Sequence, residues 1–251
     1  MLASGSLLTL RMAPRKELGE SFFALFAWVF GIFLVLGSGL ALQGALPGPT
    51  WRYGFSAIIA FAALHLVAVK GQKSWESPLR YLLVFSTWFF CFEVLTQLFP
   101  NQPTNLRIAS GLGIFSSSLL LGTTLASMLC GHWYLIDRKL DFAILRRFSK
   151  ALVASVIFKT LCFLFGFYLV SQGLPEFARA ATTIGSLANI ALILRFGLSC
   201  ILASIFSYMI WDCVKRESNQ SATGLIYVLL TLVLFGETLS IMLASVAEVI
   251  L

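Results

Sequence analysis

Seven long apolar segments constrain the fold of this chain more than any other feature. They cover residues 21–42, 53–69, 81–99, 108–135, 149–170, 188–211 and 224–246. A helix needs about 20 apolar residues to cross the hydrocarbon core of a bilayer, which is roughly 30 Å thick. The prolines at positions 47, 49, 78, 100, 103 and 175 fall between these segments, as helix-breaking residues should. The sequence therefore predicts an all-α, polytopic membrane helix bundle with seven transmembrane helices.

Composition supports a membrane protein. Only 12% of the residues are charged and 59% are hydrophobic, whereas a soluble domain has roughly 25% charged residues. The mean hydropathy is +0.89. This balance excludes a soluble enzyme, a disordered chain, a disulfide scaffold and a nucleic-acid-binding module. Because no linker separates the segments, we expect one membrane domain over residues 1–251, with a cytoplasmic N-terminal segment (1–20) followed by a seven-helix bundle (21–246).

The distribution of Lys and Arg predicts the orientation of the bundle. With seven spans, thirteen basic residues fall on one side, three on the other and two inside the membrane, out of 18. The richer side holds Arg11, Arg15, Lys16, Lys70, Lys73, Arg80, Arg138, Lys139, Arg146, Arg147, Lys150, Lys215 and Arg216. Because basic residues collect in cytoplasmic loops, we expect the N-terminus inside, the C-terminus outside, and a multi-pass protein of the inner (plasma) membrane.

The net charge of +7 is then a signal of topology and not of nucleic-acid binding. The expected partners are membrane lipids and other membrane-protein subunits, with no nucleic acid. Asp137 to Arg147 alternates charged and apolar residues, which predicts a short surface helix.

Small residues repeat every seven positions in two of the segments. These series are Ser110, Ser117, Thr124 and Gly131 in the fourth segment, and Gly224, Thr231, Thr238 and Ser245 in the seventh. Small residues on one face let helix backbones approach closely in lipid. We therefore expect both helices to lie centrally in the bundle.

Four charged residues lie within the apolar segments: Glu93, Lys159, Arg195 and Glu237. A charge at the bilayer centre costs roughly 2.5–3.5 kcal/mol on insertion scales. Helical rise places Lys159 near the midplane and the other three in the outer half. Two acids and two bases at these depths can neutralise one another. They form either an ion-paired structural lock or a site for an anionic or quinone-like ligand or a proton path.

The two histidines, His65 and His132, each lie about five residues from the inner end of their segment. The two imidazoles are therefore expected at matching depth, which is what axial ligation of a b-type haem needs. The alternatives are structural hydrogen bonds to neighbouring helices and a proton relay.

The chain has no nucleotide-binding, zinc-protease or serine-hydrolase motif, and we do not expect it to be catalytic on its own. The favoured hypothesis is an integral membrane subunit or anchor of a multi-protein complex, such as an electron-transfer complex, with a haem b or quinone site. The alternative is a small-solute or proton-coupled transporter or channel that uses the charged cluster. A lipid-modifying enzyme using the basic inner loop ranks last.

Overall fold

Every regular element that the structure describes is a helix. The computed structural model describes residues 2–13, 15–43, 58, 59, 62, 64, 76–98, 103–136, 140–173, 183 and 186–247. Its elements are α1 (Leu2–Thr9), η1 (Leu10–Met12), α2 (Arg15–Gln43), α4 (Glu76–Leu98), α5 (Thr104–Ile136), α6 (Phe142–Gly173), α8 (Leu187–Phe196), the π-helix η2 (Gly197–Leu202), α9 (Ala203–Lys215) and α10 (Asn219–Ala247). The expected all-α class is confirmed.

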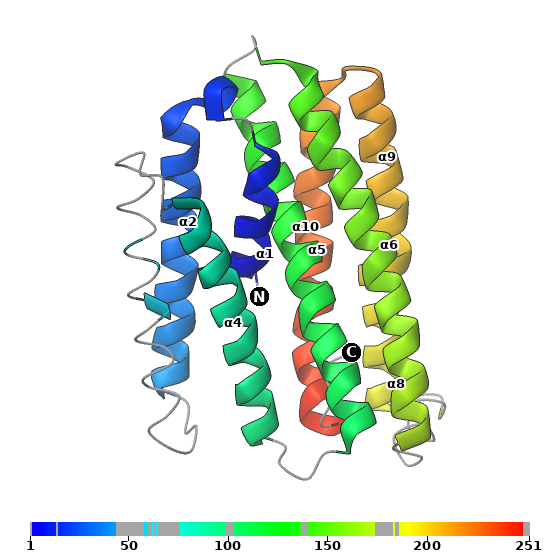
Figure 1. Ribbon diagram of the computed structural model, residues 1–251. Coiled ribbons are helices and arrows are strands. Elements are labelled where there is room, and N and C mark those ends of the chain that lie inside the picture. The colour runs from blue at the N-terminus through cyan, green and yellow to red at the C-terminus, as the bar shows by residue number, and fades with distance from the viewer. Residues whose placement is uncertain are drawn as a thin grey trace.

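Four of these helices are long and apolar enough to cross a membrane: α5, α6, the continuous α8–η2–α9 helix and α10. They run side by side through the bundle (Figure 1). The first and third predicted segments are also helical, as α2 and α4, and α2 kinks at Gly19. Nearly all of the second predicted segment, 53–69, lies outside the described residues, so the count of seven spans stays a prediction.

The bundle buries many polar side chains and exposes many apolar ones. The buried residues of α5 include seven serines and threonines, whereas exposed side chains of α6, α9 and α10 include Phe165, Tyr208 and Phe235. A protein in water buries its apolar side chains and seldom buries charged ones. The observed distribution suits helices whose outer surface contacts lipid.

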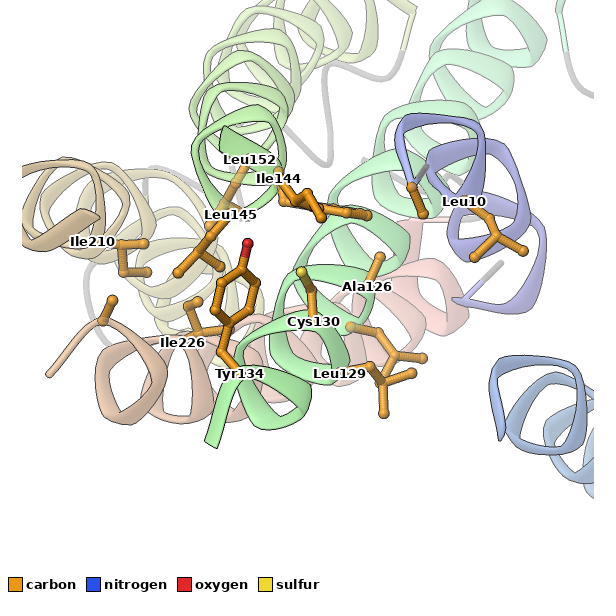
Figure 2. Close-up of a cluster of buried hydrophobic side chains, with 14 of the residues drawn as sticks. Leu10, Ala126, Leu129, Cys130, Tyr134, Ile144, Leu145, Leu152, Ile210 and Ile226 are labelled. Carbon is orange, nitrogen blue, oxygen red and sulfur yellow. The ribbon is translucent and has the colours of Figure 1, made fainter. Parts of the chain in front are cut away.

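The buried apolar side chains form two separate clusters on the long helices. The first lies where α5 ends and α6 begins, and includes residues of η1, α2, α9 and α10. Figure 2 shows Tyr134, Ile144, Leu145 and Ile226 pointing toward one another in this cluster. The second contains Leu106, Phe163, Ala191 and Leu243, near the other end of the same helices.

The short helix α1 packs inside the bundle, between α4 and α5 (Figure 1). Its Gly5 meets Gly122 of α5 so closely that a Cβ on Gly122 would lie 2.0 Å from the carbonyl carbon of Gly5. Only glycine permits this approach, because it has no Cβ. Residues 1–20 were expected to precede the bundle, but residues 2–9 are part of its packing.

The expected surface helix at 137–147 is not a separate element, because residues 142–147 form the first turns of α6. Ala143 N donates to Asp141 Oδ1 at 2.9 Å, so the Asp141 side chain accepts a hydrogen bond at the helix start. Arg146 and Arg147 are exposed while Ile144 and Leu145 are buried in the first apolar cluster. The alternating pattern therefore marks the two sides of one long helix.

The two series of small residues lie in opposite environments. Ser110, Ser117, Thr124 and Gly131 of α5 are all buried, which confirms the central position of this helix. On α10, Gly224, Thr231 and Thr238 are exposed. The buried face of α10 carries Ile226, Leu229, Val233 and Glu237 instead. A repeat of seven shows that residues share a face, but it does not show which way that face points.

Candidate functional site

Three of the four predicted intramembrane charges meet in the interior of the bundle. Lys159 of α6 lies with its Nζ 3.6 Å from Oε1 of Glu237, and Arg195 of α8 has its Nη1 3.6 Å from Oε2 of the same carboxylate. Lys159 and Arg195 are fully buried, and the Glu237 side chain is 9% exposed. Two cations therefore share one carboxylate in a water-poor interior.

Hydrogen bonds fix both cations to neighbouring helices. Lys159 Nζ donates to Ser117 Oγ of α5 at 2.8 Å. Arg195 Nη1 donates to the backbone carbonyl of Gly236 in α10 at 2.8 Å. The cluster thus joins α5, α6, α8 and α10. These are the same helices that are long and apolar enough to cross a membrane.

The backbone around Arg195 is unusual. The π-helix η2 begins two residues after Arg195 and contains Ser199. π-helical turns are rare and are frequent at functional sites. A Cβ on Gly236 would lie 1.9 Å from Ser199 Oγ, so Gly236 is the residue that lets η2 and α10 approach each other here.

The charged cluster of Lys159, Arg195 and Glu237 lies between the two apolar clusters along the helices. On α6, Val156 of the first cluster and Phe163 of the second cluster flank Lys159. On α10, Val233 and Leu243 flank Glu237 in the same way. Apolar layers on both sides keep the effective dielectric constant low, so the charges interact more strongly than they would in water.

Several polar atoms of the cluster form no hydrogen bond among the described residues. Within the described part of the chain, Nε and Nη2 of Arg195, Oγ of Ser199 and Oε1 of Glu237 are buried with no hydrogen-bond partner. The ring of Phe163 lies 5.9 Å from Arg195 Cζ, a distance at which the guanidinium interacts with the ring face. Buried polar groups are satisfied in the great majority of cases, so this concentration at one point is notable.

Glu93, the fourth predicted member, is placed elsewhere. It lies on α4, where its side chain is exposed. Helix α4 packs against α1 and α5. The structure thus assembles the charge cluster from Lys159, Arg195 and Glu237 and leaves Glu93 on another surface.

Of the two histidines predicted as haem ligands, the structure describes only His132. His65 lies outside the described residues. His132 is exposed on α5, and its Nδ1 lies 3.1 Å from the hydroxyl of Tyr227 on α10. This contact matches the expected alternative of a hydrogen bond to a neighbouring helix. In the described ranges, no group of three or more His, Cys, Asp and Glu side chains could hold a metal ion.

The sequence did not indicate the two residues that accept hydrogen bonds from the buried cations. Ser117 belongs to the small-residue series of α5, which indicates packing, yet it also accepts a hydrogen bond from Lys159. Gly236 carries no polar side chain at all. Its position directly before Glu237 in an apolar helix was the signal that could have found it.

Comparisons with protein-family models, with curated proteins and with solved structures find no match for this chain.

Proposed function

We propose that this chain is a membrane transport protein, a small-solute or proton-coupled transporter or channel, in which the Lys159–Glu237–Arg195 cluster handles the transported species. One observation carries the proposal: three charged residues meet, buried, at the centre of four helices that could each cross a membrane. Charged residues inside transmembrane segments typically mark substrate or ion pathways.

The geometry favours a binding site over a structural lock. A buried ion pair stabilises a fold only when its geometry is excellent and its remaining polar atoms are satisfied. Here both ion pairs are 3.6 Å long, whereas charge-assisted hydrogen bonds measure about 2.7–2.9 Å. Two nitrogens of Arg195 have no hydrogen-bond partner among the residues described. In a structural lock these donors would be hydrogen-bonded to other protein groups, whereas in a binding site they are left for the ligand.

The test is transport by the purified protein in liposomes. Currents on a solid-supported membrane would be recorded with a panel of small cations, anions and neutral solutes, with and without a pH gradient. We expect at least one solute or proton current in the wild type and a loss of at least tenfold in Arg195→Lys. Lysine keeps the charge but has one nitrogen, so it cannot serve both Glu237 and the Gly236 carbonyl and still offer further donors.

A matched control is available on the surface. Arg146 pairs with Glu217 at 2.9 Å, and both side chains are exposed, so Arg146→Lys makes the same substitution outside the bundle interior. This variant should transport like the wild type. Thermal unfolding in detergent would confirm that both variants are folded. Wild-type currents in a folded Arg195→Lys variant, or no current with any solute in the wild type, would contradict the proposal.

The topology proposed with this function has seven spans, the N-terminus inside and the C-terminus outside, in the inner membrane. The positions of charged residues support it. Arg146, Lys150, Lys215 and Arg216 all lie at the end of the bundle where α6 begins and α9 ends. The Lys150 and Lys215 ammonium groups lie 5.8 and 5.1 Å from the Trp211 ring. Tryptophan and basic side chains are typical of the membrane–water interface.

A second candidate is the membrane subunit of an electron-transfer complex, with a haem b or quinone site and with lipids and other subunits as partners. One observation favours it: Tyr227 contacts Nδ1 of the exposed His132, and a histidine ligand usually has its second nitrogen held in this way. His65 would supply the other axial ligand. A purified protein with no Soret absorption band would exclude the haem.

A further inference from the structure

We propose that the cluster binds a small monovalent anion, held by the unpartnered N–H groups of Arg195 and the hydroxyl of Ser199. This inference rests on the proposed transport function and names the class of solute. No nucleic acid or lipid headgroup is involved, because the site lies in the interior between the four long helices.

The charges of the cluster favour a monovalent anion. Lys159 and Arg195 carry two positive charges, and the carboxylate that both contact, Glu237, carries one negative charge. Among the described side chains, the cluster therefore has one positive charge in excess. An uncompensated charge in an apolar interior is costly, and a monovalent anion balances it. A divalent anion would replace the excess positive charge with an excess negative one.

Unused hydrogen-bond donors of the cluster also suit an anion. Nη1 of Arg195 is used by Gly236 and lies near Glu237, but Nε and Nη2 are buried without a partner in the part of the chain that the structure describes. These two nitrogens form one edge of the planar guanidinium, which suits oxyanions such as nitrate or a small carboxylate. Ser199 lies one helical turn beyond Arg195, and its hydroxyl is likewise buried and unpartnered.

The apolar surroundings of the cluster favour an anion that loses its water easily. Apolar residues lie on both sides of the cluster along α6 and α10, and Phe163 lies against the guanidinium. Phe163 also lines an apolar groove of about 340 Å³ between α6 and the α8–η2 segment. An anion that enters must leave most of its water behind, which favours weakly hydrated anions. We therefore expect nitrate to bind more tightly than fluoride.

The experiment is equilibrium binding of sodium nitrate to the full-length protein in detergent, by calorimetric titration, with sodium sulfate at equal ionic strength as a reference. The variant Lys159→Met removes the excess charge and leaves the Arg195–Glu237 pair, which is neutral overall. We expect saturable nitrate binding in the wild type and at least tenfold weaker binding in Lys159→Met. The matched control is Lys150→Met, the same substitution on the exposed side of the same helix, which should bind like the wild type.

A second variant, Ser199→Ala, leaves every charge in place and removes one donor. It should bind nitrate several-fold more weakly and should unfold at nearly the wild-type temperature. The inference is overturned if the wild type shows no saturable nitrate binding, or if Lys159→Met binds nitrate as tightly as Lys150→Met does.

The two proposals can fail separately. Currents of a cation or a neutral solute that depend on Arg195, without nitrate binding, would overturn the anion site and leave the transport function standing. Saturable nitrate binding without a current for any solute would overturn the transport function and leave the anion site standing.

Discussion

At the scale of single residues, Glu237 is the one negative charge of the three-residue cluster. It is the shared partner of Lys159 and Arg195, both of which are fully buried. Breaking a buried ion pair by removing one partner is far more destabilising than replacing the whole pair, because a charge is left behind without compensation. Glu237 should therefore contribute more to stability than either of the cations that it contacts.

The substitution Glu237→Gln tests this point. It keeps the shape of the side chain but leaves two buried cations without a counter-charge, so we expect a loss of about 3–5 kcal/mol of unfolding free energy, the range measured when one partner of a buried pair is removed. Thermal unfolding in detergent would measure it. Glu217→Gln, in the exposed pair with Arg146, should cost less than about 1 kcal/mol. Equal effects of the two substitutions would contradict the central role of Glu237.

The residues of the cluster could be predicted from the sequence, but not their grouping. Helical rise gives the depth of each charged residue, and depth correctly allowed Lys159, Arg195 and Glu237 to meet. It could not separate Glu93 from them, because depth does not specify which neighbour a helix face contacts. That information depends on how α4 packs against α1 and α5.

At the scale of elements, the close approach of η2 to α10 positions Arg195. The Gly236 carbonyl accepts the Arg195 hydrogen bond, while the absence of a side chain on Gly236 makes room for Ser199. One residue thus serves two contacts, and both depend on the distance between the helices. Any group that separates η2 from α10 should also disturb the cluster.

We expect Gly236→Ala to cost about 1–3 kcal/mol, the usual range for overpacking an interior. Its Cβ would lie 1.9 Å from Ser199 Oγ and 3.2 Å from Ser199 Cβ. Adding Ser199→Ala removes the first collision and leaves the second, so the double variant should recover part of the loss. Thermal unfolding of the three variants would measure this coupling.

The control on the same helix is Gly224→Ala. Apart from its chain neighbours and the backbone of its own helix, no described atom lies within 4 Å of a Cβ at position 224. Alanine also favours a helix over glycine by about 0.5–1 kcal/mol. This variant should be as stable as the wild type or more stable. If Gly236→Ala behaved in the same way, the close approach would not matter for stability.

Helix positions were predictable where periodicity and length were strong. The segments now seen as α5, α6, α8–η2–α9 and α10 were all anticipated, because each has a long apolar run. The π-helical turn in the sixth segment was not, since η2 has the composition Gly-Leu-Ser-Cys-Ile-Leu, which suits an ordinary helix. The helix α1 was also missed, because eight residues are too few to produce a recognisable apolar segment.

At the scale of the whole molecule, the fold places a charged cluster between apolar layers of the interior, exposes apolar side chains on its sides and concentrates basic residues at one end. The long helices expose side chains such as Ile157, Leu161 and Phe235. Ion pairs on exposed side chains, Arg146 with Glu217 and Arg216 with Asp212, lie where α6 begins and where α9 ends. The apolar surface and the charged end together indicate how the bundle would sit in a bilayer.

Labelling of single cysteines would test this orientation. In a variant with all five native cysteines replaced, Ser218→Cys lies in the turn between α9 and α10, and Thr104→Cys lies at the start of α5. These two positions are at opposite ends of the bundle, and basic side chains surround position 218. A membrane-impermeant maleimide should therefore label Thr104→Cys in right-side-out vesicles and Ser218→Cys only in inside-out vesicles.

The reverse pattern would show that the basic end faces outward, and the charge distribution would then need another explanation. Labelling of both positions from the same side would contradict the crossing of the membrane by all three helices between them, namely α5, α6 and α8–η2–α9. That result would undermine the transport proposal as well, because the cluster at Lys159 and Glu237 lies along the helices that must connect the two sides. The labelling experiment thus tests whether α5, α6 and the α8–η2–α9 helix cross the bilayer, a condition on which both functional proposals depend.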